Sequence, residues 1–308
     1  MKAAKLVFMG SPDFALPSLQ ALAQHFNVCG VVTQPDRPAG RGRQLNPPPV
    51  KVLAKALGLP VIQPVRIHKD PQAMAQLQAW QPDAIIVAAF GQILRPQVLD
   101  LPPYGCINVH ASLLPRWRGA APINAAILHG DHETGITIMK MDAGLDTGPI
   151  LSQRTIPIQP QDTAGTLFDR LAAAGAELLV ETLPGYLSGE IQPHPQQDEL
   201  ATYAPMLTKA EGELDFQHTA AELERQVRAF NPWPGTFIHW QDTLLKIHRA
   251  HRVRTSSPGA GVLTIQDGLP AVGCSQDLLV LDEVQPAGKR SMPGSVFLHG
   301  ARDWGTQI

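Results

Sequence analysis

Residues 5–33 read KLVFMGSPDFALPSLQALAQHFNVCGVVT. The run at 5–9 is apolar, residues 16–26 repeat apolar side chains at helical spacing, and a second apolar run follows at 28–33. Two short apolar runs separated by an amphipathic helix are typical of a βαβ unit, in which both strands are buried and parallel. The sequence therefore predicts a parallel sheet that begins at residue 5.

The same alternation continues along the first half of the chain. Apolar runs at 84–89, 106–110 and 135–141 predict further strands, and residues 122–129 predict a helix between the last two. This order predicts an α/β domain built on a doubly wound, Rossmann-like parallel sheet. Ligands of such sheets bind beyond the carboxyl ends of the strands, so candidate site residues are sought there.

The pattern changes towards residue 189. An amphipathic helix is expected at 163–183, where Pro184 and Gly185 should end it, and the segment that follows is rich in Pro and Gln, the composition of a linker. The rest of the chain holds short apolar segments separated by Gly, Pro or Asp, which predict a small, OB-like β-barrel. We therefore expect three parts, namely an α/β domain at 1–189, a linker at 190–205 and a C-terminal β-barrel domain at 206–308.

Composition excludes several classes of protein. The 308 residues are 44% hydrophobic and 17% charged, which argues against a disordered chain, and the net charge of -2 provides no general attraction for nucleic acid or anionic lipid. Cys29, Cys106 and Cys274 are odd in number and far apart, which argues against a disulfide framework and a thiolate zinc site. We expect a cytoplasmic protein without a membrane partner, because the apolar run near the N-terminus is too short for a signal sequence or a membrane span.

The strand predicted at 106–110 ends in polar residues. Asn108 and His110 are two residues apart, so both side chains face the same side of the strand, near its carboxyl end. The loop DAGLDTGP, residues 142–149, follows the next strand and could aim Asp146 at His110. An amide, an imidazole and a carboxylate together can bind a carbonyl oxygen and move a proton. An isolated pair of this kind is more often a turn asparagine and a hydrogen-bonded histidine at the edge of the core.

Two motifs carry a resemblance to a known family. NVHASLLP at 108–115 and GLDTG at 144–148 resemble the signature of the formyltransferases that use 10-formyltetrahydrofolate. TQPDRPAGRG at 33–42 and FNPWP at 230–234 resemble the members of that family that act on an aminoacylated tRNA. The resemblance runs from Gly10 into the C-terminal domain and weakens after Gly288.

The resemblance implies an enzyme that transfers the formyl group of 10-formyltetrahydrofolate to the amino group of methionyl-initiator tRNA for translation initiation. Its catalytic residues would be Asn108, His110 and Asp146. Asn108 and His110 would stabilise the formyl oxygen, while Asp146 would orient His110 and help to relay the proton of the attacking amine. Neither a metal nor a covalent nucleophile is expected, and Cys106 is interpreted as a buried strand residue.

The family also implies where the two substrates bind. The folate cosubstrate is expected beside Ser112, Leu113, Leu114 and Pro115, with Pro115 fixing the loop. For the tRNA, the resemblance implicates a loop rich in Pro and Gly, which we expect to lack regular structure and to contact the acceptor stem. Its basic residues are Arg37, Arg41 and Arg43, of which the resemblance singles out Arg41.

A second basic segment lies in the C-terminal domain. Residues 246–254 contain four Lys or Arg and no acidic residue. A regular strand here would place Lys246, His248, Ala250, Arg252 and Arg254 on one face. We interpret Lys246 and Arg252 as contacts to tRNA phosphates. The other interpretation is a charged strand edge that deters aggregation.

Two other functions remain open at this stage. A formyltransferase that acts on a small amine, such as glycinamide ribonucleotide or an amino sugar, would share Asn108, His110 and Asp146. A non-catalytic RNA-binding protein could retain the α/β domain as a scaffold without turnover. The basic loop and the additional domain favour tRNA as the substrate, and we expect a monomer.

Overall fold

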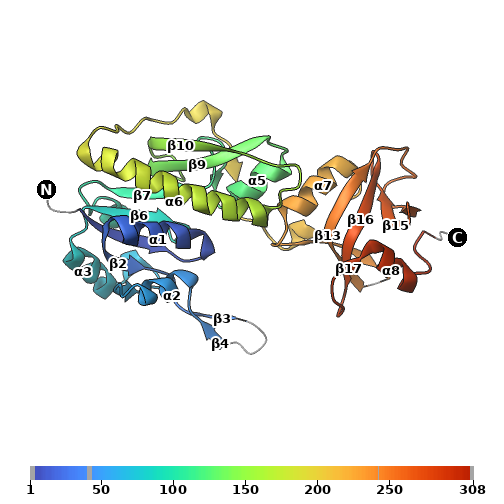
Figure 1. The fold of residues 1–308 in the computed structure, drawn as a ribbon, viewed down its shortest axis with the longest axis horizontal. Helices are drawn as coiled ribbons and strands as arrows, with labels where there is room; N and C mark the ends of the chain where they lie inside the picture. The colour runs from blue at the N-terminus through green and yellow to red at the C-terminus, as the bar shows by residue number, and fades with distance from the viewer. Residues whose placement is uncertain (1–3, 40–43, 242, 306–308) are drawn as a thin grey trace. The chain divides into compact units, whose positions relative to one another are not determined.

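The computed structural model describes residues 4–39, 44–241 and 243–305, and these form two compact units, each with its own main sheet (Figure 1). The first unit takes residues up to 122, 133–157 and 168–204, and the second takes 123–132, 158–167 and 205 onwards. The domain boundaries expected from the sequence, 1–189, 190–205 and 206–308, stay a prediction.

Most of the regular structure up to residue 204 belongs to one α/β sheet and the helices around it. The elements in chain order are β1 (Lys5–Gly10), α1 (Leu16–His25), β2 (Asn27–Val32), β3 (Arg37–Ala39), β4 (Gln44–Asn46), α2 (Pro49–Ala56), β5 (Val61–Ile62), α3 (Pro71–Trp80), β6 (Ala84–Ala88), α4 (Pro96–Leu99), β7 (Cys106–His110), β8 (Arg118–Gly119), α5 (Pro122–Leu128), β9 (Glu133–Lys140), β10 (Ile150–Pro157), α6 (Ala164–Ser188) and β11 (Tyr203–Ala204).

The main sheet has the strand order β10-β9-β7-β6-β1-β2-β5. The parallel strands are β5, β2, β1, β6 and β7. After β1 the chain adds β2 and β5 on one side of β1 and then β6 and β7 on its other side, which confirms the doubly wound, Rossmann-like fold. The strand predicted at 135–141 is present as β9, but β9 runs antiparallel to β7, and β10 antiparallel to β9. The expectation of an all-parallel sheet is therefore wrong at this edge, because a buried apolar strand has the same pattern in either direction.

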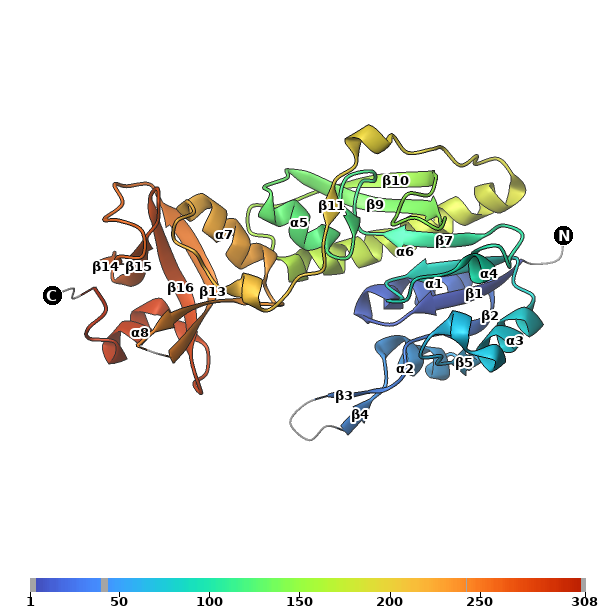
Figure 2. The same ribbon diagram turned by 180° about the vertical axis from the view of Figure 1, so that it is seen from behind.

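Helices cover both faces of this sheet (Figures 1 and 2). On one face, Phe14 before α1 contacts Phe168 of α6 edge to face, with 5.3 Å between the ring centroids. On the other face, Leu77 of α3 and Val98 of α4 share a buried cluster with Val7 of β1. The carboxyl ends of β1, β6 and β7 are left between these layers, where ligands of doubly wound sheets bind.

Helix α6 continues beyond the end predicted at Pro184 and reaches Ser188. A proline removes one backbone hydrogen bond within a helix, so the sequence favoured an end at this point. Packing offsets that loss, because Leu183 and Tyr186 are buried and the Tyr186 hydroxyl donates a 2.7 Å hydrogen bond to the carbonyl oxygen of Tyr104. The predicted end of the helix is therefore wrong by about one turn.

The second unit is an antiparallel sheet packed against helices. Its elements after residue 205 are α7 (Ala220–Ala229), β12 (Thr236–Trp240), β13 (Thr243–Val253), β14 (Leu263–Gln266), β15 (Leu269–Gly273), β16 (Leu278–Pro286), β17 (Met292–Pro293) and α8 (Gly294–Gly300). The strand order is β12-β13-β16-β15-β14, with β17 on β16. Leu223 and Val227 of α7, one turn apart, pack into a core that also holds Leu279 and Trp304. The predicted small β domain is confirmed as this antiparallel sheet.

Candidate active site

Asn108 and His110 lie on β7, a strand that is paired on both sides, with β6 and β9. The two residues are 9% and 6% exposed. Because alternate residues of a strand face the same side, the two side chains project together near the carboxyl end of β7. Because β7 is paired on both sides, its backbone is fixed, so Asn108 and His110 are in place before any substrate binds.

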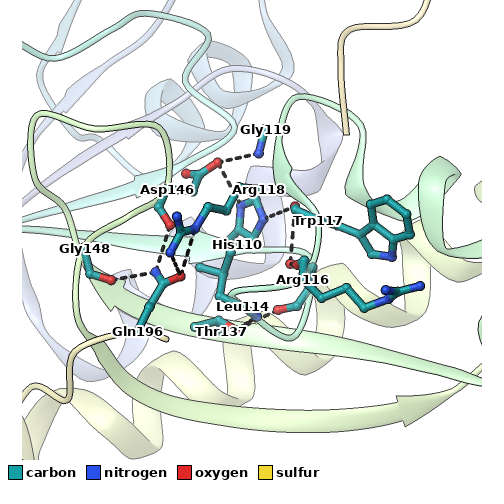
Figure 3. A network of polar contacts seen from close by, with 11 residues as sticks. His110, Leu114, Arg116, Trp117, Arg118, Gly119, Thr137, Asp146, Gly148 and Gln196 are labelled. Atoms are coloured by element: carbon teal, nitrogen blue, oxygen red, sulfur yellow. Dashed lines mark hydrogen bonds and ion pairs between the residues drawn. The ribbon is translucent and has the colours of Figure 1, made fainter. Parts of the chain in front are cut away.

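The two ring nitrogens of His110 face different partners (Figure 3). Nε2 lies 3.0 Å from the carbonyl oxygen of Trp117, which can only accept a hydrogen bond, so Nε2 carries a proton. Nδ1 lies 3.7 Å from Oδ2 of Asp146. The carbonyl oxygen of Trp117 therefore leaves Nδ1 as the nitrogen that can gain or lose a proton.

Asp146 lies in the loop between β9 and β10, with a left-handed backbone at φ 53°. Its Oδ2 accepts a 2.8 Å hydrogen bond from the backbone N–H of Gly119. Two residues on, a Cβ added to Gly148 would lie 1.9 Å from the carbonyl oxygen of Lys140, so only glycine fits there. The loop thus brings Asp146 to His110, as the sequence predicted.

The Asn108 amide is the polar group of the site without a protein partner. Among the residues that the structure describes, none forms a hydrogen bond with its side chain. Its amide atoms are not among the fully buried side-chain atoms that lack a partner in the described part of the chain, so they reach the surface of the site. An amide of this kind is available to donate hydrogen bonds to a bound substrate.

Hydrogen bonds to neighbouring residues fix the loop at 112–115, which is predicted to contact the folate. The Ser112 hydroxyl donates a 2.6 Å hydrogen bond to the carbonyl oxygen of Arg116. The backbone N–H of Leu114 donates to Thr137, and Leu114 precedes Pro115 through a cis peptide bond. Ser112 and Leu114 are buried, whereas Leu113 and Pro115 are partly exposed. The predicted folate contact of these four residues stays a prediction.

The basic loop is only partly described. Arg37 lies on β3, is exposed, and donates a 3.2 Å hydrogen bond from Nη2 to Oε1 of Gln34. Arg41 and Arg43 lie outside the described residues. The prediction that the loop lacks regular structure is wrong for its two arms, because β3 and β4 pair as an antiparallel hairpin.

The basic strand of the second unit does not present one charged face. The pairing of β13 with β16 shifts register between Ile247 and Ala250, and both of these side chains are buried. The irregularity reverses the alternation, so the predicted single face of Lys246, Ala250 and Arg252 is wrong. Lys246 is exposed, whereas Nε of Arg252 forms a 2.6 Å ion pair with Asp277. Of the two predicted phosphate contacts, only Lys246 has no ion pair with another described residue.

The three cysteines are free thiols, and Cys106 and Cys274 are buried. Burial raises the pKa of the Cys106 thiol to about 12 and that of Cys274 to about 11, so both thiols are neutral near pH 7.

In the described part of the chain, no group of three or more His, Cys, Asp or Glu side chains is arranged to hold a metal ion. None of the helices in that part combines the length and the apolar composition needed to cross a membrane.

Two residues of the site were missed by the sequence analysis. The Gln196 amide donates hydrogen bonds to the carbonyl oxygens of Asp146 and Gly148, at 2.8 and 2.7 Å. Arg118, 2% exposed, donates in turn to Oε1 of Gln196. No motif in the sequence marks either residue, since Gln196 lies in the segment interpreted as a linker.

The fold places the chain among the formyl transferases. The sequence model of the family "Formyl transferase" matches residues 1–183, and that of "Formyl transferase, C-terminal domain" matches residues 206–302. A crystal structure of WlaRD, a sugar 3N-formyl transferase, aligns with 94% of this chain and 100% of its own at a TM-score of 0.69 and 17% identity. HypX from Aquifex aeolicus in complex with tetrahydrofolic acid aligns with 97% of this chain and 47% of its own, at a TM-score of 0.62 and 16% identity.

Sequence relatives are much closer. The methionyl-tRNA formyltransferase of Myxococcus xanthus is 49% identical over 97% of this chain and 96% of its own length. That of Geobacillus thermodenitrificans is 48% identical over 96% of this chain and 94% of its own length. The chain therefore belongs to the methionyl-tRNA formyltransferase family.

Proposed function

We propose that the chain transfers the formyl group of 10-formyltetrahydrofolate to the amino group of methionyl-initiator tRNA. Family membership over nearly the whole chain supports this reaction and both substrates. Within the site, the observation that carries the proposal is the accessible amide of Asn108, which bonds to no described residue, beside the His110 and Asp146 pair. A carbonyl oxygen that gains negative charge during the reaction needs such a preorganised donor.

Asn108 is the proposed donor to the formyl oxygen. As the amine of methionine attacks the formyl carbon, electron density moves onto that oxygen, and a hydrogen bond to it becomes stronger. No described residue takes the hydrogens of this amide, so both remain available to the substrate. A donor that gains strength only as charge develops lowers the barrier rather than tightening binding of the ground state.

His110 and Asp146 are the proposed proton-handling pair. The amine loses a proton during the transfer, and Nδ1 of His110 is the ring nitrogen free to exchange one. The Asp146 carboxylate faces that nitrogen at 3.7 Å and is itself held by the N–H of Gly119. We propose that Asp146 orients the ring and relays the proton, directly or through water.

The folate supplies the formyl carbon, and we propose that the loops after β6 and β7 bind it. In the loop at 112–115, Ser112 and Leu114 are buried and hydrogen-bonded to Arg116 and Thr137. Leu113 and Pro115 are partly exposed and are the members that can contact a ligand. The loop after β6 exposes Ile93 by 73%, an apolar surface suited to the face of a ring. The two loops follow β6 and β7, neighbouring parallel strands on one side of β1. In doubly wound sheets the order of the strands reverses beside the first strand, and ligands bind at that point, so the position of the two loops fits a ligand site.

For the tRNA we propose two contact regions. One is the loop that carries Arg37, Arg41 and Arg43. The other is a cavity of about 470 Å³ in the second unit, lined by Lys209, Lys246, His248 and the peptide around Pro232. Two ammonium groups around one hollow suit a phosphate, whereas the ion-paired Arg252 contributes less than the sequence suggested.

We further propose that the protein acts as a monomer in the cytoplasm, which size-exclusion chromatography and cell fractionation would test.

The test of the reaction is its dependence on the folate donor. Purified protein, methionyl-initiator tRNA and 10-formyltetrahydrofolate should yield N-formylmethionine on the tRNA, detected by mass spectrometry after hydrolysis of the ester. Replacing the donor with tetrahydrofolate, or the charged tRNA with uncharged tRNA, should abolish the product. Absence of a formylated product with all three components present would contradict the proposal.

A further inference from the structure

The segment between α6 and residue 205 lies along the site rather than apart from it. Its strand β11 pairs with β8, the short strand of Arg118 and Gly119. Earlier in the segment, His194 and Ile150 form an isolated antiparallel bridge beside the Asp146 loop. The hydroxyl oxygen of Thr202 accepts a 2.9 Å hydrogen bond from the backbone N–H of Trp117. The segment is therefore fixed to the Asp146 loop and to residues 117–119, which contact His110 and Asp146.

Gln196 is the side chain of this segment that contacts the Asp146 loop (Figure 3). Its amide nitrogen lies 2.8 Å from the carbonyl oxygen of Asp146 and 2.7 Å from that of Gly148. Both partners accept only, so each takes one of the two amide hydrogens. One side chain thereby joins the two backbone carbonyls that flank Thr147.

Arg118 fixes the orientation of that amide. Nε and Nη2 of Arg118 lie 3.1 and 2.8 Å from Oε1 of Gln196. A guanidinium only donates, so the oxygen of the amide must face Arg118 and the nitrogen must face the loop. Nη2 also donates to Asp198 at 2.7 Å, which holds the guanidinium from the same segment. The amide thus has all its strong hydrogen-bonding positions filled in a single orientation.

The loop held in this way carries a conformation that needs support. Asp146 has a left-handed backbone, which non-glycine residues adopt rarely and keep only where neighbours impose it. Gln196 holds its carbonyl, and the N–H of Gly119, next to Arg118, holds its carboxylate. Gly119 cannot be replaced, because an added Cβ would lie 2.6 Å from the carbonyl oxygen of Ala204.

We propose that Gln196, oriented by Arg118, is a positioning residue that holds Asp146 at its distance from Nδ1 of His110. The proposal rests on the proposed function in one respect, namely that Asp146 takes part in the formyl transfer. Gln196 itself contacts neither substrate. Its effect on turnover passes through the backbone of the Asp146 loop.

The variant Gln196→Glu separates this role from general anchoring. A carboxylate keeps an acceptor for Arg118 but donates nothing to the carbonyls of Asp146 and Gly148. We expect kcat to fall about tenfold to hundredfold, because a small displacement of a catalytic group has effects of this size. The KM for the folate and the melting temperature should change little, within about 2 °C for the latter. A kcat within about twofold of the wild type would overturn the proposal.

Gln197→Glu is the matched control, since it places the same charge on the neighbouring exposed side chain. It should keep wild-type kcat. Gln196→Ala should reproduce the loss of kcat without any new charge. If Gln197→Glu lost as much activity as Gln196→Glu, the effect would reflect the charge of the segment rather than the amide, and the proposal would be wrong.

A double-mutant cycle tests whether the effect passes through Asp146. In an Asp146→Asn background, Gln196→Glu should reduce kcat by less than about twofold, because the group it positions has already been disabled. A full, multiplicative loss in that background would overturn the proposal.

A readout independent of activity separates this proposal from the proposed function. Amide hydrogen exchange of residues 143–148 should be faster in Gln196→Glu than in the wild type and in Gln197→Glu, because the loop loses two backbone contacts. Unchanged exchange would overturn the positioning role even in an active enzyme. If exchange is faster in Gln196→Glu but the wild type transfers no formyl group, the positioning of the loop by Gln196 stands and only the proposed function is refuted.

Discussion

The ring of His110 is held between a carbonyl oxygen and a carboxylate. The carbonyl oxygen of Trp117 accepts a hydrogen bond from Nε2, and Asp146 faces Nδ1, so the tautomer and the plane of the ring are set by the protein. A general acid or base acts efficiently when its geometry needs no rearrangement during the reaction. The same holds for the Asn108 amide, whose donors stay available because no described residue takes them.

Asn108→Ala should lower kcat by about 100-fold to 1,000-fold, the usual cost of losing one donor to a developing oxyanion. Asn108→Asp should lower kcat at least as much, because an ionised carboxylate repels negative charge on the formyl oxygen. Steady-state kinetics with saturating folate donor measures both effects, and circular dichroism checks the fold. A loss of less than about fivefold in either variant would contradict the role of Asn108.

The thiol of Cys106 should be chemically silent although it lies two residues from Asn108. Burial raises its pKa to about 12, so at pH 8 the thiol is protonated and inaccessible. Iodoacetamide should leave Cys106 unmodified in the native protein and alkylate it in denaturant, as measured by peptide mass spectrometry. Alkylation in the native protein with loss of activity would point to a reactive thiol and contradict this assignment.

Residue types and their spacing allowed Asn108, His110 and Asp146 to be predicted, because they stand in short motifs at strand ends. Gln196 could not be predicted in this way. Its partners are two backbone carbonyls about fifty positions earlier, and backbone carbonyls leave no mark on a sequence. Arg118 gave no signal either, since a buried arginine has the same letter as an exposed one.

At the scale of elements, periodicity predicted the existence of strands better than their direction or regularity. Strand β9 was predicted at nearly its observed length but runs antiparallel, because burial on both faces gives the same apolar run either way. Strand β13 was predicted as regular, but its register shift places Ala250 in the core. A shift of this kind depends on the partner strand, so local pattern alone does not reveal it.

Helix α7 owes part of its stability to a capping box. Thr219 accepts a hydrogen bond from the backbone N–H of Glu222, and Glu222 accepts one from the N–H of Thr219. Thr219→Ala should lower the free energy of unfolding by about 1 kcal/mol at pH 7. Urea unfolding followed by circular dichroism measures this change, and an unchanged midpoint would contradict the role of the cap.

The cap also predicts a pH dependence. Hydrogen bonds from the backbone and then the hydroxyl of Thr219 lower the pKa of Glu222 below its usual 4.5. A carboxylate with a lowered pKa stabilises the fold above that usual value and loses its contribution as the pH falls through the folded pKa. The difference in unfolding free energy between the wild type and Glu222→Gln should therefore shrink as the pH falls below 4.5. A constant difference would contradict this linkage.

At the scale of the whole molecule, charge is distributed rather than concentrated. The net charge is -2, so attraction for tRNA must come from local groups of basic residues. Several basic side chains of the second unit are already paired, as Arg252 is with Asp277. The exposed Lys246, together with Lys209 at the same cavity, remains available for phosphates.

Replacing Lys209 and Lys246 with Ala should weaken tRNA binding and reduce the salt dependence of the affinity. Each lost phosphate contact lowers the slope of log Kd against log salt by about 1. Filter binding at several salt concentrations measures the slope, and Arg252→Ala serves as a comparison with a smaller expected effect. An unchanged slope in the double variant would show that the cavity does not bind phosphate.

The central claim is that this chain formylates methionine only when it is attached to tRNA. The most direct measurement compares kcat/KM for methionyl-initiator tRNA, free methionine and glycinamide ribonucleotide, with 10-formyltetrahydrofolate as the donor in each case. We predict rapid formylation of the charged tRNA and no measurable product with either small amine. Formylation of a small amine without reaction of the charged tRNA would keep the fold and the Asn108, His110 and Asp146 chemistry but contradict the proposed substrate.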